Sequence, residues 1–281
     1  LNAGLTPLDP APIAICTAVD IQQAPCVTSN GSGFLVVWQD SRNALAPYYF
    51  TDIYGAIVSA TGSVTAVSGA ISMYTGNQAK PRAASDGTDY FVVWEDYRFG
   101  YPLIYGARVT SAGAPSPAVG IPMPATSTNQ TNPFILHGGG NYLVTWSDGY
   151  RIAGCRVNSS GTVIDVSGIN IDSGSTAKAR PSTCCDGAGF QAVWEDYRSQ
   201  LAGNSDVYYT TLSPTGVVSG DPKPGLVADL TPQTAPRVFG NSSDGVLFYT
   251  RVEGYINSLC VAPLAQQGAP TDVATISAAK L

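Results

Sequence analysis

Tyr90-Phe-Val-Val-Trp94-Glu-Asp96-Tyr-Arg98 is the stretch that decides the fold, because close copies of it recur along the chain. Three further copies are clear and a fifth is weaker: 34–42, 142–148, 190–198 and 246–251. Their aromatic anchors lie 48 to 56 residues apart: Trp38, Trp94, Trp146, Trp194 and Tyr249. A proline stands 13 positions before every anchor: Pro25, Pro81, Pro133, Pro181 and Pro236. This register predicts five copies of one structural unit.

Each unit reads as four short strands. In the second copy, 80–85 predicts a first strand, Asp86-Gly87 a hairpin turn and 90–94 a second strand. The second strand is apolar at consecutive positions, which is expected when neighbouring sheets cover both of its faces. Units of this length cannot bury both faces alone and stack around a ring as β-propeller blades. We therefore predict an all-β fold, a five-bladed β-propeller with four antiparallel strands per blade and a ring closed by a terminal strand.

The whole chain is expected to form one domain, 1–281, with five blades at approximately 20–73, 74–124, 125–172, 173–229 and 230–281. Both termini read as fourth strands, so six segments compete for five places. We expect 11–18 to close the ring against the last blade, since an open edge invites aggregation, and 273–276 to be surplus. That closure would bring Cys16 and Cys260 within disulfide reach. If these cysteines are not bonded to each other, the C-terminal strand closes the ring instead.

Composition narrows the class of protein. Charged residues make up 12% of the chain, well below the usual fraction of about 25%, which suits a secreted, extracellular or cell-surface β-protein. The six cysteines show no metal-binding spacing, so we expect disulfides, no metal and no cofactor. A net charge of -6 without a Lys/Arg cluster argues against nucleic acid as a partner, and no apolar run is long enough for a membrane span.

The recurring end of the second strand, Trp94-Glu-Asp96-x-Arg98, has two interpretations. The recurring Asp and Arg could contact ligands on one face of the ring. We favour a structural corner, in which the carboxylate accepts hydrogen bonds from loop N–H groups and from the guanidinium.

A second signal is an aromatic surface in the loops between second and third strands. Flat rings stack on sugars and amide groups bond sugar hydroxyls, so tyrosines beside glutamines predict a glycan-binding face. The alternative is that these tyrosines only shield blade edges. The predicted ligand-binding residues are Tyr49, Tyr97, Tyr101, Tyr150, Tyr197, Gln78, Gln130 and Gln233.

Support for catalysis is thin in the sequence. The single histidine, His137, falls at a hairpin position and is expected to be a solvated turn residue. Glycosidases use a pair of carboxyl groups, but the five predicted inner strands carry none. Glu95 and Glu195 remain as candidates, which we expect in loops, and we predict no catalytic residues.

Over 11–278 the repeat resembles the Val-Val-Trp-x-Asp-x-Arg … Ile-Tyr-Gly-Ala propeller repeats of secreted or surface-anchored bacterial proteins. Five near-equal blades also resemble a lectin-type propeller, a likeness of architecture. The leading prediction is a non-catalytic extracellular module that binds a glycan or cell-surface polysaccharide through the Tyr-rich loops. Two alternatives stay open. One is a self-associating surface protein that uses the surplus terminal strand, and the other is a polysaccharide-active enzyme that uses Glu95 or Glu195.

Overall fold

The computed structural model describes residues 11–44, 50–127, 129–185, 187, 189–198, 204–224, 231–240, 245–253, 256–264 and 275–276. Within these residues the chain forms twenty strands in five four-stranded antiparallel sheets, and no helix. No helix suited to crossing a membrane is found in the same residues. The prediction of five blades with four antiparallel strands each is confirmed.

Each blade takes four strands in chain order. The first consists of β1 (Gln22–Ser29), β2 (Gly33–Asp40), β3 (Asp52–Ser59) and β4 (Val64–Ala66). The second consists of β5 (Gln78–Ser85), β6 (Tyr90–Asp96), β7 (Leu103–Val109) and β8 (Pro115–Pro122). The third consists of β9 (Thr131–Gly138), β10 (Asn141–Ser147), β11 (Ile152–Val157) and β12 (Ile169–Asp172). The fourth and fifth consist of β13 (Lys178–Cys185), β14 (Phe190–Asp196), β15 (Asp206–Leu212) and β16 (Val218–Pro224), then β17 (Gln233–Gly240), β18 (Gly245–Glu253), β19 (Ile256–Leu264) and β20 (Thr275–Ile276).

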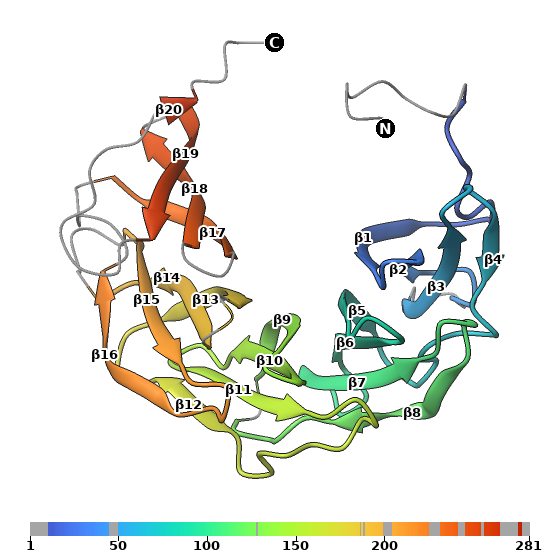
Figure 1. The fold of residues 1–281 in the computed structure, drawn as a ribbon, viewed down its shortest axis with the longest axis horizontal. Coiled ribbons are helices and arrows are strands. Elements are labelled where there is room, and N and C mark those ends of the chain that lie inside the picture. Colours follow the sequence, from blue (N-terminus) through green and yellow to red (C-terminus); the bar gives the residue numbers. More distant parts are fainter. Residues whose placement is uncertain are drawn as a thin grey trace.

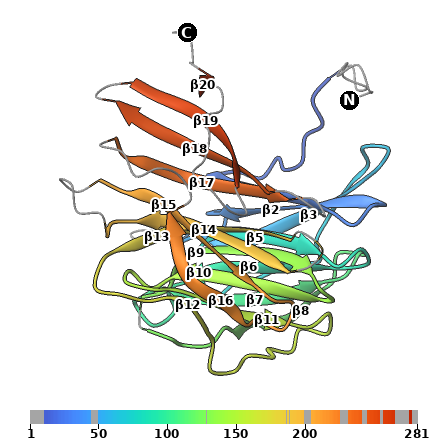
Figure 2. The same ribbon diagram turned by 60° about the vertical axis from the view of Figure 1, so that its left-hand side comes forward.

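The first strands of the blades line the middle of the molecule. Figure 1 shows the blades following one another around a curve, and Figure 2 shows the same order from another side. The inner strands β1, β5, β9, β13 and β17 contact one another in that sequence. The first and last blades lie on either side of an opening in Figure 1.

The second strands form the core, as their apolar runs predict. Every residue of β6 and of β14 is buried. The indoles of Trp94, Trp146 and Trp194 are fully buried, because the neighbouring blade covers the face that their own sheet leaves open. Burying such aromatic side chains supplies much of the free energy that holds one blade against the next.

The Trp-x-Asp-x-Arg segment is a structural corner, as favoured above. In the second blade, Trp94 Nε1 donates to Asp96 Oδ2 at 3.0 Å. The Arg98 side chain pairs with the same carboxylate at 2.7 Å and lies 3.9 Å from the Tyr105 ring centroid. Blades one and four repeat the ion pair, through Arg42 with Asp40 and Arg198 with Asp196. The Asp and Arg of the motif therefore pair with each other inside blades one, two and four.

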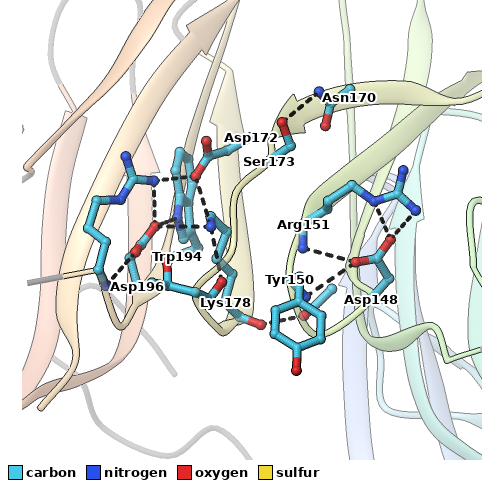
Figure 3. A network of polar contacts seen from close by, with 12 residues as sticks. Asp148, Tyr150, Arg151, Asn170, Asp172, Ser173, Lys178, Trp194 and Asp196 are labelled. Carbon is cyan, nitrogen blue, oxygen red and sulfur yellow. Dashed lines mark hydrogen bonds and ion pairs between the residues drawn. The ribbon is translucent and has the colours of Figure 1, made fainter. Parts of the chain in front are cut away.

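The fourth blade carries a buried lysine where the other four blades have glutamine. Figure 3 shows Lys178 near Asp172 and Asp196, and its Nζ lies 3.7 Å and 3.9 Å from their carboxylates. Arg198 pairs with both carboxylates as well. Burial raises the pKa of Asp172, although the two cations act against this. Two cations thus balance two carboxylates at this junction.

The ends of the chain differ from the prediction. Residues 11–18 form no strand, so the predicted N-terminal closing strand is absent from this part of the chain. Instead β20 pairs with β19, with Thr275 opposite Cys260, and takes the outermost place in the last blade. The predicted disulfide between Cys16 and Cys260 is wrong, since all six cysteines are free thiols and Cys16 Sγ accepts a hydrogen bond from Arg42.

Candidate functional site

Each inner strand carries the same backbone irregularity. The residue before each blade proline has a positive φ of 51° to 55°: Ala24, Lys80, Asn132, Arg180 and Ala235. A non-glycine residue there costs on the order of 1 to 3 kcal/mol and persists where its surroundings hold it. The register between first and second strands shifts at this point in all five blades. The distortion therefore belongs to the repeat.

Hydrogen bonds between blades hold this irregular residue. The Lys80 N–H donates to Gln39 Oε1 of the preceding blade at 2.9 Å. The Asn132 N–H donates to Glu95 Oε1 at 2.7 Å, and the Ala235 N–H donates to Glu195 Oε1 at 2.5 Å. The residue that follows the anchor tryptophan thus links one blade to the next.

Glu95 and Glu195 lie on strands, not in loops as predicted. Both are buried, at the ends of β6 and β14. Lys80 Nζ pairs with Glu95 at 3.0 Å, and Arg180 Nη1 pairs with Glu195 at 2.8 Å. The Tyr97 hydroxyl also donates to Glu95, at 2.9 Å. Burial and the charge of Glu95 raise the pKa of Tyr97 to about 12, so this tyrosine stays protonated at neutral pH.

A cavity of about 160 Å³ lies among the inner strands of four blades. It is lined by Lys80, Arg82, Asn132, Pro133, Phe134, Arg180, Pro181 and Arg237. Lys80, Asn132 and Arg180 thus connect the cavity with the two buried glutamates. The cavity is therefore large enough for a sugar unit, its lining is cationic, and two carboxylates lie next to that lining.

Only some of the tyrosines predicted to bind a glycan are exposed in the part of the chain that the structure describes. Tyr49 lies outside the described residues. Tyr101 and Tyr150 are exposed, and the Tyr101 ring lies 6.3 Å from that of Phe99. Tyr97 and Tyr197 are half-buried, and Tyr97 is bonded to Glu95. Sugar binding by these tyrosines stays a prediction.

The predicted role of the glutamines is wrong, because they are buried and bonded within the fold. Gln78 accepts from the Tyr74 N–H and donates to the Gly76 carbonyl. Gln130 accepts from the Ile104 N–H and donates to the Pro124 carbonyl. Gln233 is likewise buried, and its Oε1 accepts from the Val207 N–H. These amides hold blade connections in place and do not face a ligand.

His137 lies on β9, in a shallow groove of about 450 Å³ whose lining also includes Asp86 and Arg108. It is half-buried, and its ring packs against Tyr142 with the centroids 5.0 Å apart. Burial lowers the pKa of His137, while the Asp86 charge partly offsets this. It is therefore less solvated than predicted. The part of the chain that the structure describes contains no His, Cys, Asp or Glu group able to hold a metal ion.

Sequence reasoning missed Arg82 and Arg237. Each directly follows a blade proline, Pro81 or Pro236, so the fivefold register carried a signal for two cations at one level of the ring. They escaped notice because they lie more than 150 residues apart and form no cluster in sequence.

No protein-family model and no curated protein matches this sequence. Solved structures do match in fold. An α-L-arabinanase from Penicillium chrysogenum, complexed with arabinobiose, is 13% identical and has a TM-score of 0.61, over 90% of this chain and 80% of that one. An α-L-arabinofuranosidase from Lactobacillus brevis is 10% identical and has a TM-score of 0.51, over 89% of this chain and 93% of that one.

These similarities correct the expected function. The sequence predicts a non-catalytic, lectin-like module and no catalytic residues. The solved structures that share the fold are named for enzymes that cleave sugar linkages, which overturns both expectations. At this level of identity the likeness establishes the shared five-bladed fold and leaves the chemistry of this chain to its own residues.

Proposed function

We propose that this chain is a polysaccharide-active enzyme whose site is the central cavity, with Glu95 and Glu195 as its working carboxylates. Glycoside hydrolysis generally uses two carboxyl groups, one as acid and the other as nucleophile or base. Each glutamate is bonded to a residue that lines the cavity. The fold, shared with an arabinanase and an arabinofuranosidase, supports the same class of activity.

The observation that carries this proposal is the contrast with Gln39. Gln39 follows Trp38 as Glu95 follows Trp94, and its amide oxygen accepts the same hydrogen bond between blades. A carboxylate is therefore not required for that contact. Burying a negative charge costs free energy that an ion pair often does not recover in full, and the cations that pair with these glutamates, Lys80 and Arg180, are themselves half-exposed. A neutral glutamine would therefore be the cheaper structural choice. Two buried glutamates beside the cavity favour a chemical role.

The contacts of the two carboxylates suggest their roles. Glu95 accepts from Lys80, Tyr97 and the Asn132 N–H, which suits the carboxylate that acts as base or nucleophile. Glu195, with fewer donors in the described contacts, suits the acid. The Lys80 and Arg180 side chains are 49% and 51% exposed, so a sugar entering the cavity can displace them from the carboxylates.

The test is release of reducing ends from arabinan and from neutral and acidic plant polysaccharides. We expect turnover by the wild type and a loss of kcat of at least about 100-fold in Glu95→Gln and in Glu195→Gln, with little change in Tm. Gln39→Ala is the matched control, since it removes the same contact between blades without touching either carboxylate. It should lower Tm and leave kcat unchanged. Equal turnover by all four proteins, or none by the wild type, would contradict the proposal.

Location and assembly remain separate questions. We propose an extracellular or cell-surface protein, which the low charge content supports, and fractionation of the producing cells tests it. A wholly cytoplasmic pool would contradict it. Assembly through a surplus strand loses its basis, because β20 is already paired within the last blade.

A further inference from the structure

The central cavity is positively charged although the chain is acidic overall. The net charge of the chain is -6. The cavity is nevertheless lined by four cationic side chains and no carboxylate: Lys80, Arg82, Arg180 and Arg237. Two of the four, Lys80 and Arg180, are balanced by the buried glutamates behind them. The other two are not.

Arg82 and Arg237 have no ion-pair partner among the residues that the structure describes. Burial lowers the pKa of Arg237 and the like charges of Arg82 and Arg180 lower it further, although the charge of Glu195 acts in the opposite direction. Placing unpaired cations together in a partly buried space is unfavourable unless a bound anion offsets their mutual repulsion and their loss of hydration. Their arrangement favours the binding of an anion.

The two arginines are held in the same way. Arg82 Nη1 donates to the Pro81 carbonyl at 2.9 Å, and Arg237 Nη1 donates to the Pro236 carbonyl at 2.8 Å. These bonds fix part of each guanidinium and leave its remaining N–H groups for a ligand. Guanidinium groups suit planar or tetrahedral oxyanions because they donate in a fixed fork, and a fixed fork loses less entropy when it binds.

We propose that the central cavity binds the oxyanion of an acidic sugar, the carboxylate of a uronate or a sulfate ester, through Arg82 and Arg237. This rests on the proposed function and names its substrate class, an acidic polysaccharide. Phe134, half-buried in the lining, offers an apolar face to the sugar ring. The volume of about 160 Å³ is below the roughly 300 to 1,000 Å³ of sites for drug-sized ligands, so it fits one sugar unit.

Calorimetric titration of the full chain tests this with trigalacturonate, a sulfated disaccharide and neutral arabinotriose as probes. We expect at least one acidic probe to bind about tenfold or more tightly than arabinotriose, and more weakly as salt rises. Whichever acidic probe binds better identifies the source of the oxyanion. Arg82→Gln and Arg237→Gln should each weaken acidic binding about tenfold or more. Arg82→Lys and Arg237→Lys, which keep the charge, should fall between.

Arg108→Gln is the matched control. It removes one positive charge from β7, where Arg108 pairs with Asp89 outside the central cavity, and should leave the affinity unchanged. The inference is overturned if arabinotriose binds as tightly as both acidic probes, or if the cavity variants fold and keep wild-type affinity. Arginine-dependent acidic binding without turnover would refute only the enzymatic function. Turnover of a neutral glycan without acidic preference would refute only this inference.

Discussion

Trp94→Ala is expected to destabilise the chain by about 3 to 5 kcal/mol. The indole is fully buried between blades, and an aromatic side chain of this kind buries about 200 Å², or about 5 kcal/mol at ~25 cal/mol per Å² before the alanine is counted. The lost Nε1 bond to Asp96 adds little, about 1 kcal/mol, because Asp96 keeps its bonds from the Arg98 main chain and guanidinium. Urea unfolding followed by circular dichroism measures the change.

Phe99→Ala is the control for this prediction. Phe99 follows the same strand, yet its side chain is 58% exposed, so the loss should stay below about 1 kcal/mol. Similar losses at both positions would refute the assignment of Trp94 to the core and Phe99 to the surface. A loss below about 1 kcal/mol for Trp94→Ala would refute the packing of one blade on the next.

Further predictions concern charge and thiols. Lys178→Gln should cost about 3 kcal/mol at pH 7, because Asp172 and Asp196 lose a buried cation, and less at pH 3, where protonation of Asp172 removes the need for one. Burial would raise the pKa of Asp196, but hydrogen bonds from an arginine and an indole outweigh it and lower the pKa. As the pH falls, Asp196 is therefore protonated in the unfolded chain before it is protonated in the folded one. The free energy of unfolding should decrease below about pH 4, and it should decrease less steeply in Asp196→Asn. The lowered pKa of His137 likewise predicts a loss of stability as pH falls below about 6.5, absent in His137→Gln. Thiol titration of the denatured, unreduced protein should find six thiols per chain. A smaller number would mean that a disulfide is present.

The repeat could be predicted from the sequence because each blade is one continuous segment of the chain, so the sequence period matches the structural unit. The apolar run from Tyr90 to Trp94 and the proline 13 positions before the anchor recur in every blade, so strand order and core followed directly. Closure did not follow, because 11–18 and 273–276 have the same pattern. Only the observed pairing of β20 with β19 distinguishes them.

The candidate site was harder to predict, because it depends on where side chains point. Glu95 looks like a loop residue in sequence, yet the ladder continues to Asp96 and leaves it buried. Gln130 looks like an amide free for a ligand, but its oxygen accepts from the Ile104 N–H of β7 and its NH2 group donates to the Pro124 carbonyl in the connection before its strand. Arg82 and Arg237 meet only because the ring brings their blades around one cavity.

We expect the cavity among the inner strands, and not the Tyr-rich loops, to bind the glycan. Crystals of the Glu95→Gln/Glu195→Gln double variant, soaked separately with trigalacturonate and arabinotriose, test it most directly. We expect trigalacturonate to place a sugar ring beside Phe134 with its charged group between Arg82 and Arg237. A sugar stacked on Tyr101 or Tyr150, with the cavity unchanged, would contradict it.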